Sequence, residues 1–231
     1  MPIFSDNFNR ANEALEDGAN WAADTAPGLY NIVTNQVVIT TGGDFNTVAW
    51  VDGIASRADM IVECDMRPTS TLQNPGLFVI ARRTGLGNLY SAGVGGPDHE
   101  PQIRKQVASV TTILASAAGI GASTGFRTYR IEVEGTAIRL FIGGALQLST
   151  TDSSHTAAGF GGILSSSADA TSNAIFDLFS ISEFIVAAPA LPAIAVPLGP
   201  AAPVFEVPDE PYGRYKSTLT LHEQFSRARL G

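Results

Sequence analysis

The sequence predicts an all-β protein in which two antiparallel sheets pack as a sandwich, followed by an extended proline-rich C-terminal arm that ends in a short helix. Three observations support this prediction. Strand-like runs separated by turn residues recur up to residue 186. No helical stripe of useful length interrupts them. Beyond residue 186 proline recurs every few residues. We therefore divide the chain into a sandwich domain (1–186), an arm (187–212) and a docking segment (213–231).

The predicted strands follow one another at short intervals. The one segment that departs from this pattern is NRANEALEDG near the start, which can form one or two helical turns. About ten short strands suit two packed antiparallel sheets, and a domain of this size buries enough surface to fold without a metal or a disulfide. Outside the most regular stretch, the predicted strands are 30–39, 45–51, 59–66, 76–82, 88–94, 103–114 and 174–186.

The most regular stretch is YRIEVEGTAIRLFIGGALQLST. From Tyr129 to Val133 every second residue is apolar, and the alternation resumes from Ile138 to Ile142 after a glycine. Two further glycines precede Leu146, where a third run begins. Period-two alternation interrupted by glycine predicts a three-stranded antiparallel meander.

Both faces of this meander can be assigned. Four charged residues share the polar face, which predicts cross-strand ion pairs worth about a few tenths of a kcal/mol each. These residues are Arg130, Glu132, Glu134 and Arg139. The residues expected to point into the sandwich, in the meander and in the last strand, include Val133, Ile138, Leu140, Phe176 and Phe179.

Composition excludes several classes of protein. The net charge is −8, whereas nucleic-acid-binding proteins need a basic surface, so we expect no nucleic-acid partner. The single cysteine, Cys64, cannot form an internal disulfide. The start MPIFSDNFNR lacks the basic region and apolar core of a signal peptide, so we expect no secretion signal.

Three stretches carry a resemblance to a known family. TYRIEVEGTAIRLFIGGALQLSTTDS resembles the laminin-G/concanavalin-A-like jelly roll, and NAIFDLFSIS is similar to the closing strand of that family. The opening SDNFNRAN, with Trp21 shortly after it, resembles the first strand of such sandwiches in bacteriophage structural proteins. The resemblance covers about residues 3–185 and implies a jelly-roll sandwich, but a fold of this kind hosts many functions.

Because this fold includes glycoside hydrolases, the carboxylates Glu63 and Asp65 in VECDM need attention. Glucanases of the fold use a pattern resembling E-x-D-x-x-E or E-x-D-x-E, since retaining chemistry needs two carboxyl groups about 5–5.5 Å apart. Here Arg67 and the proline after it occupy the positions of the second glutamate. We therefore expect no enzyme activity. Glu63 and Asp65 are predicted on a solvated sheet face, with Ile61 and Cys64 on or near the core side.

Acidic residues also occur in two predicted rim loops. GGPDHEP contains Asp98, His99 and Glu100, and TTDSSH contains Asp152. The resemblance implies calcium bound by rim-loop carboxylates and carbonyls at such positions, and the alternative is a plain acidic loop. No other cofactor is expected. Neither His99 nor His155 has a partner pattern for nucleophilic catalysis.

Four aromatic residues are candidates for stacking on sugar rings: Trp21, Tyr30, Trp50 and Tyr90. In a jelly roll such residues belong either to the core or to an exposed platform, and no alternation in the sequence places these four on one surface. Both interpretations stay open.

The stretch IVAAPALPAIAVPLGPAAPVF has no charged residue and is long enough to cross a bilayer. A membrane helix is excluded because each interior proline costs about 3 kcal/mol, so we expect no membrane insertion. Alanine and proline instead favour an extended rod. Its apolar side chains have no core of their own and are predicted to dock on a neighbouring subunit. The expected anchors are Leu191, Ile194, Val196, Leu198, Val204 and Phe205.

The docking segment ends in a predicted short helix. Thr220 and Glu223 form a capping-box pattern, and Leu221 and Phe225 lie on one side of the helix. About ten residues are too few for a helix to persist alone in water, so Leu221 and Phe225 are predicted as further anchors.

These features together predict a non-enzymatic structural protein of a bacteriophage virion, made in the host cytoplasm. A minor tail or tail-tip protein and a capsid decoration protein both fit. The expected partners are other virion proteins and copies of the chain itself. The competing hypothesis is a carbohydrate-binding module that adsorbs to a host glycan.

Overall fold

A computed structural model describes residues 1–24, 29–39, 47–69, 76–96, 98–121, 123–166 and 174–184. Contacts divide the chain into the units Met1–Val186 and Ala187–Gly231. All the described residues belong to the first unit, so the predicted arm and docking segment lie outside them. In the described part of the chain no helix has the length and apolar character needed to cross a bilayer.

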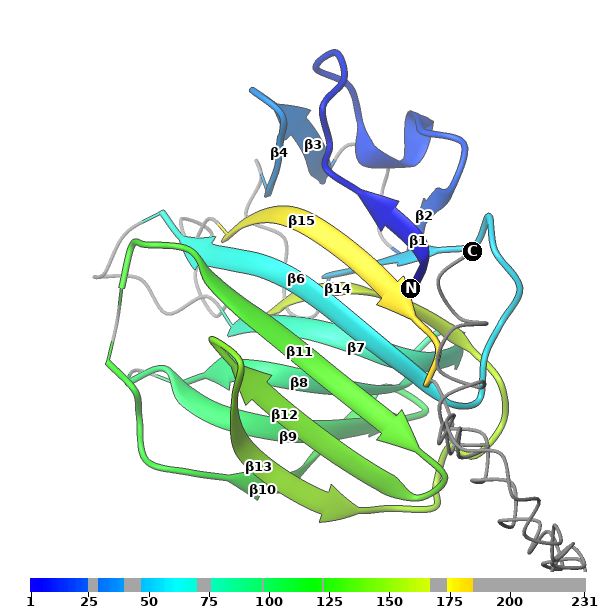
Figure 1. The fold of residues 1–231 in the computed structure, drawn as a ribbon, viewed down its shortest axis with the longest axis vertical. Coiled ribbons are helices and arrows are strands. Elements are labelled where there is room, and N and C mark those ends of the chain that lie inside the picture. Colours follow the sequence, from blue (N-terminus) through cyan, green and yellow to red (C-terminus); the bar gives the residue numbers. More distant parts are fainter. Residues whose placement is uncertain are drawn as a thin grey trace, which may run out of the picture. The chain divides into compact units, whose positions relative to one another are not determined.

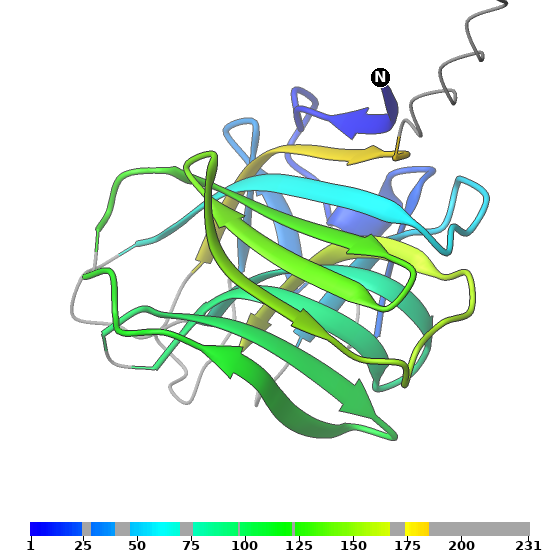
Figure 2. The same ribbon diagram turned by 60° about the horizontal axis from the view of Figure 1, so that its bottom comes forward.

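The described residues contain fifteen strands and one short 3₁₀ helix, and the strands form two antiparallel sheets (Figures 1 and 2). The predicted two-sheet sandwich is confirmed. Sheet A has eight strands, with β1 beside β15 in addition to the main order. In that order sheet A contains β13 (Ala145–Thr151), β12 (Ala137–Ile142), β11 (Arg127–Glu134), β6 (Met60–Pro68), β15 (Ala174–Ser182), β4 (Gln36–Ile39) and β3 (Tyr30–Val33), and β1 is Pro2–Asp6.

Sheet B has seven strands and packs against sheet A. Its strands in order are β10 (Val110–Ser116), β9 (Glu100–Val107), β8 (Asn88–Gly95), β7 (Gly76–Gly85), β14 (Phe160–Ser166), β5 (Thr47–Val51) and β2 (Trp21–Ala23). The predicted meander is confirmed as β11, β12 and β13, paired in sequence order.

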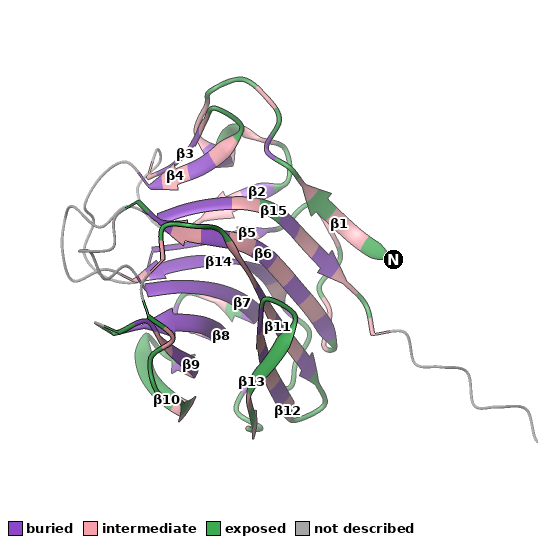
Figure 3. Ribbon diagram, turned by 60° about the vertical axis from the view of Figure 1, so that its left-hand side comes forward, coloured by how far each residue is buried: buried purple, intermediate pink, exposed green. Residues whose placement is uncertain are grey.

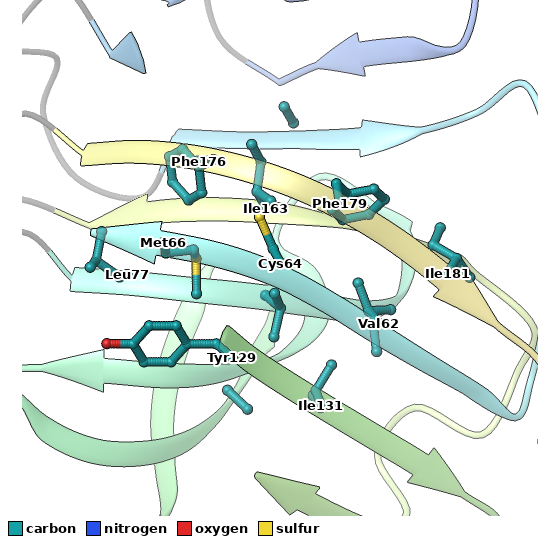
Figure 4. Packing of buried hydrophobic residues seen from close by; sticks show 14 of the residues in the cluster. Val62, Cys64, Met66, Leu77, Tyr129, Ile131, Ile163, Phe176, Phe179 and Ile181 are labelled. Carbon is teal, nitrogen blue, oxygen red and sulfur yellow. The ribbon is translucent and has the colours of Figure 1, made fainter. Parts of the chain in front are cut away.

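The main core lies between the two sheets. Alternate residues of β6, from Met60 to Met66, point into it and meet residues of β7, β14 and β15 (Figure 4). The five residues predicted to point inward, Val133, Ile138, Leu140, Phe176 and Phe179, are all at most 1% exposed. The predicted cross-strand ion pairs on the polar face are confirmed for Arg139 of β12, which contacts Glu132 at 3.5 Å and Glu134 at 3.3 Å. Arg130 contacts Glu132 at 3.2 Å, but both of these residues belong to β11.

Two predicted strands are wrong, because each is a hairpin. Segment 30–39 divides into β3 and β4, and segment 103–114 divides into β9 and β10. Each turn has two central residues with positive φ: Thr34 and Asn35 at 51° and 63°, and Ala108 and Ser109 at 48° and 68°. Positive φ at both positions is the type I′ arrangement that matches strand twist. Neither turn contains glycine or proline, so no turn signal in the sequence marks a break.

One smaller prediction is also wrong. Ile61 is not on the core side, because β6 alternates strictly and Ile61 shares the outer face with Glu63 and Asp65, while Cys64 is buried. The segment NRANEALEDG, predicted to form one or two helical turns, forms one, the 3₁₀ helix η1 (Leu15–Asp17). A single turn suffices there because Leu15, 1% exposed, anchors it in the core.

The opening motif SDNF has a structural role at the end of β1. Oδ1 of Asp6 accepts a hydrogen bond from the backbone N–H of Phe8 (2.7 Å), and Oδ2 accepts one from the indole N–H of Trp21 (2.9 Å). The guanidinium of Arg10 also contacts this carboxylate, at 2.8 Å. Trp21 packs edge-on against Phe179, with 4.9 Å between the ring centroids. Asp6 thus fixes the chain from β1 to β2 onto the core.

Candidate functional site

The central strands β7 and β8 of sheet B are buried on both faces, unlike the strands of sheet A. In Figure 3 β7 and β8 are purple along most of their length, whereas the edge strands β10 and β13 are largely green. Leu77 and Val79 belong to the core between the sheets, but Phe78 and Ile80 belong to a second apolar cluster. Because neighbouring residues of a strand point to opposite faces, this cluster lies on the outer face of sheet B, directed away from sheet A. Its members are Val48, Phe78, Ile80, Leu89 and Leu164, with Trp50 packed against them.

Trp50 and an arginine paired with a carboxylate lie on one side of this outer face. The guanidinium carbon of Arg83 lies 3.3 Å from the ring centroid of Trp50, which is half-buried. Arg83 donates from Nε to Oδ2 of Asp24 at 3.2 Å, and its Nη2 contacts Oδ1 of the same carboxylate. Two parallel contacts of this kind fix a guanidinium in orientation as well as position. Trp50 is therefore held by a rigid charged pair.

A second arginine marks the other side. The guanidinium carbon of Arg104 lies 4.1 Å from the ring centroid of Phe78. Its Nε donates to Oε1 of Gln102 at 2.7 Å, and its Nη1 donates to Oγ of Ser166 at 3.4 Å. A methyl group on Gly95 would lie 2.4 Å from Nη2 of Arg104, so glycine at that position lets the guanidinium cross over β8. Burial lowers the pKa of Arg104 to about 10, so the side chain is still a cation at neutral pH.

Strand register places Trp50 and Arg104 at the two ends of one row. Trp50 pairs with Gly162, Gly162 with Ile80, Ile80 with Ser91, and Ser91 with Arg104. The row crosses five adjacent strands, and four spacings of about 4.8 Å separate its ends by about 19 Å. The residues between the ends are small or apolar, and all three are buried. The row therefore has a half-buried planar group at each end, Trp50 and Arg104.

The predicted rim-loop residues do not converge. Asp98 is exposed and His99 is 2% exposed, and their carbonyls accept hydrogen bonds from the backbone N–H groups of Gly121 (3.3 Å) and Ile120 (3.2 Å). Glu100 begins β9 and pairs with Gly95, at the far end of β8. The residues that the structure describes contain no group of three or more His, Cys, Asp or Glu side chains that could hold a metal ion.

Asp152 lies near the opposite end of β8 and belongs to a different arrangement. Its carboxylate accepts hydrogen bonds from Nζ of Lys105 at 2.8 Å and from the hydroxyl of Tyr90 at 2.7 Å. Burial opposes ionisation of Asp152, but the hydrogen bonds from Lys105, Tyr90 and Ser154 outweigh it and hold the pKa well below its usual range. Burial and the contact with Asp152 raise the pKa of Tyr90 to about 12.

His155 completes this arrangement. Its backbone N–H donates to the Tyr90 hydroxyl at 3.0 Å, and its carbonyl accepts from Nη1 of Arg82 at 2.8 Å. The imidazole Nε2 lies 2.6 Å from the carbonyl oxygen of Gln106. These contacts tie the loop after β13 to strands β7, β8 and β9, which gives Asp152 and His155 a structural role.

Glu63 and Asp65 lie on the outer face of sheet A, on the opposite side of the sandwich from the row. Oδ1 of Asp65 accepts a hydrogen bond from the hydroxyl of Thr128 at 2.6 Å. Arg67, on the same face of β6, lies with its guanidinium carbon 4.9 Å from the ring centroid of Phe126. An arginine thus stands where the glucanase pattern would place its second carboxylate.

Of the four aromatic candidates, three are core residues. Tyr30 and Tyr90 are fully buried and Trp21 is 4% exposed, which leaves Trp50 on an outer face. The predicted anchors Leu191, Ile194, Val196, Leu198, Val204, Phe205, Leu221 and Phe225 lie outside the described residues.

Sequence comparison identifies no relative: no family model matches the chain, and no curated protein matches it. Solved structures do match. The carbohydrate-binding module CBM66 from Bacillus subtilis is similar with a TM-score of 0.59 and 15% identity, over 71% of this chain and 96% of that one. The laminarinase from Rhodothermus marinus has a TM-score of 0.57 and 15% identity, over 78% and 96%. The exoplasmic/lumenal domain of VIP36, bound to calcium and mannose, has a TM-score of 0.57 and 10% identity, over 72% and 84%.

The chain has a jelly-roll fold. This confirms the fold that the resemblance implied, whereas at such low identity the neighbours establish nothing beyond the fold. They include both binding domains and an enzyme. The predicted bacteriophage origin has no counterpart among them and stays a prediction.

Sequence reasoning missed Arg83, Gln102 and Arg104. The signal that could have found them is the run of apolar residues in β7, GLFVIA, which lacks alternation. A strand without alternation is buried on both faces, and that would have directed attention to the second face of sheet B.

Proposed function

We propose that this protein is a non-enzymatic carbohydrate-binding domain that holds a glycan across the outer face of sheet B. The observation that carries the proposal is the row from Trp50 to Arg104. A sugar ring has an apolar face of C–H groups and a rim of hydroxyl groups. An aromatic ring suits the first, and fixed guanidinium and amide groups suit the second. Two of the structural neighbours, a carbohydrate-binding module and a mannose-bound domain, support the same function.

The shape of the row favours a chain over a single sugar. Its ends are about 19 Å apart. Ile80, Ser91 and Gly162 between them are buried, so the half-buried Trp50 and Arg104 are the members of the row that can meet an extended ligand. Binding sites of this kind combine apolar surface with a few precisely held polar groups. Arg104, fixed by Gln102, supplies such a group at one end, and Arg83, fixed by Asp24, holds Trp50 at the other.

Tryptophan fluorescence of the full-length protein tests this function directly. The chain has two tryptophans, Trp21 in the core and Trp50 on the outer face. Titration with a panel of soluble polysaccharides, including laminarin and mannan, should change the emission through Trp50. The change should persist in Trp21→Phe and disappear in Trp50→Phe, and binding measured by calorimetry should weaken at least tenfold in Trp50→Ala. Absence of binding to the whole panel, or unchanged affinity in Trp50→Ala, would contradict the proposal.

We also propose that the domain does not hydrolyse its ligand. The support is the substitution at the glucanase position, where Arg67 follows Glu63 and Asp65 on the face of sheet A opposite the row. The wild type should release no reducing ends from laminarin. Release that is abolished in Glu63→Gln would show that the domain is an enzyme.

A place in a virion and a tethering role for residues 187–231 stay proposals from the sequence. They are compatible with glycan binding, because a binding domain needs an attachment to its particle. A protein that ends at Val186 should keep its melting temperature within a few degrees and lose incorporation into the assembly. Normal incorporation of the truncated protein would remove the support for the tether.

A further inference from the structure

Arg104 has no carboxylate partner among the described residues. No aspartate or glutamate oxygen of the described part lies within 4 Å of its guanidinium, since it takes part in none of the salt bridges there. Its polar contacts are the neutral groups of Gln102 and Ser166. Gln102 in turn donates from Nε2 to Oε2 of Glu100 at 3.3 Å. The Glu100 carboxylate is therefore linked to Arg104 through Gln102 and not directly.

The other arginines of sheet B differ from Arg104 in this respect. Arg83 is paired with Asp24 on the same outer face, and Arg82 donates from Nη2 to Oδ1 of Asp59 at 3.1 Å. Of the three arginines on sheet B, two therefore have a carboxylate partner, and the half-buried Arg104 contacts neutral groups among the described residues. A partly desolvated cation without a counter-charge is costly unless something else supplies the negative charge.

The guanidinium of Arg104 is also held in place as a binding group would be. Phe78 supports its flat side, Gln102 fixes Nε, and the missing side chain of Gly95 makes room for Nη2. Within the described residues Nη2 of Arg104 has no acceptor, and it is the donor that a ligand would use. Because the protein carries a net charge of −8, attraction of an anion has to be local rather than a property of the overall field.

We propose that the outer face of sheet B selects acidic glycans, with Arg104 binding a carboxylate or sulfate group of the sugar chain while Trp50 contacts a sugar ring about 19 Å away. This inference rests on the proposed glycan-binding function and specifies its ligand class. Guanidinium groups bind both kinds of anion through paired N–H···O contacts, so the two sources share one chemistry. Gln102 and Gly95 act as positioning residues for Arg104.

Two matched pairs of polysaccharides test the proposal in the full-length protein. Polygalacturonate is compared with its methyl ester, and dextran sulfate with dextran, so that each pair differs in the anionic group alone. Calorimetry at constant ionic strength should give at least tenfold tighter binding of one charged member than of its neutral partner. Arg104→Gln should abolish this preference. Arg104→Lys, which keeps the charge but loses the planar fork, should retain only part of it.

Arg139→Gln is the matched control, because it removes the same charge from the outer face of sheet A. It should leave the preference unchanged. The pair that shows the preference identifies the anion as carboxylate or sulfate. Equal loss in Arg139→Gln and Arg104→Gln would reduce the effect to net charge and overturn the proposal.

A second measurement does not depend on the sugar backbone. Titration of the full-length protein with sodium sulfate against sodium chloride at equal ionic strength should shift the Nε–H NMR signal of Arg104 saturably and leave that of Arg139 unaffected. Absence of a shift at Arg104 overturns the acidic-ligand proposal.

The outcomes also separate this inference from the function on which it rests. Binding of neutral and charged members with equal affinity, still lost in Trp50→Ala, would overturn selection of acidic glycans and leave glycan binding intact. Failure of every polysaccharide to bind would instead contradict the proposed function itself.

Discussion

Replacing Asp6 with alanine removes one carboxylate that joins three parts of the N-terminal segment. It leaves the N–H of Phe8 and the indole N–H of Trp21 without their acceptor in a region where both residues are at most 4% exposed. Each unsatisfied donor costs about 1–1.5 kcal/mol. The Arg10 contact adds less than about 1 kcal/mol, because that side chain is 29% exposed and solvent screens the pair.

Together these losses lower the free energy of unfolding of Asp6→Ala by about 3 kcal/mol. For a domain of this size that corresponds to a fall in melting temperature of about 6–12 °C. Urea denaturation followed by circular dichroism measures the change. Asn7→Ala is the matched control, because Oδ1 of Asn7 accepts a single exposed hydrogen bond, from the N–H of Asn9 at 3.2 Å. It should change stability by less than about 0.5 kcal/mol.

A double-mutant cycle isolates the bond between Asp6 and the indole. Trp21→Phe keeps most of the packing on Phe179 and removes the N–H donor. The coupling between the two substitutions should be about 1 kcal/mol. An Asp6→Ala protein within 1 kcal/mol of the wild type, or strictly additive substitutions, would refute the structural role assigned to the SDNF motif.

Three further predictions follow from the burial of single side chains. Burial raises the pKa of Tyr129 to about 12, so the folded state favours the neutral phenol. The contribution of Tyr129 to the free energy of unfolding is complete below pH 10 and falls by about 1.4 kcal/mol per pH unit between pH 10 and 12. In thermal melts over this pH range, Tyr129→Phe should therefore show a shallower fall in melting temperature than the wild type. Leu140→Asp places a charge at a fully buried position and should abolish soluble expression, whereas Leu146→Asp, at a position 55% exposed, should not; a soluble, cooperatively melting Leu140→Asp protein would show that the core face of β12 is assigned wrongly. Cys64 is fully buried and burial raises its thiol pKa, so Ellman's reagent should react with it in urea and not in the native protein; rapid native labelling would contradict this.

The sequence was most informative in strands that bury one face against the core and turn the other face toward solvent. Strands β11 and β12 were predicted together with their inward face, because in this part of sheet A one face is buried and the other is half-exposed. The ion pairs of Arg139 followed from the same alternation, since cross-strand neighbours on the polar face are fixed once the hairpin is placed. The replacement of the glucanase glutamate was likewise evident from the six consecutive positions 63–68 of β6.

The two hairpin turns were not predicted. The turns at Thr34-Asn35 and Ala108-Ser109 require left-handed backbone, which is strained for residues other than glycine. Residues of other types adopt it when good pairing of the flanking strands offsets the strain. The strand pairing that compensates this cost is a tertiary property, so the two hairpins were read as single strands.

The candidate site was decided by tertiary structure alone. Asp24, Trp50, Arg83 and Arg104 are dispersed over 81 positions of the sequence. They meet on one face because β14, which follows β9 in the sequence, lies between β5 and β7 in sheet B and joins β5 to the run β7, β8 and β9. The sequence by itself determined the fold class, the inward residues of sheet A and the broken glucanase pattern, because each of these depends on local periodicity or on residue identity. Which arginine gains a carboxylate and which does not depends on long-range strand register, and only the folded structure fixes that register.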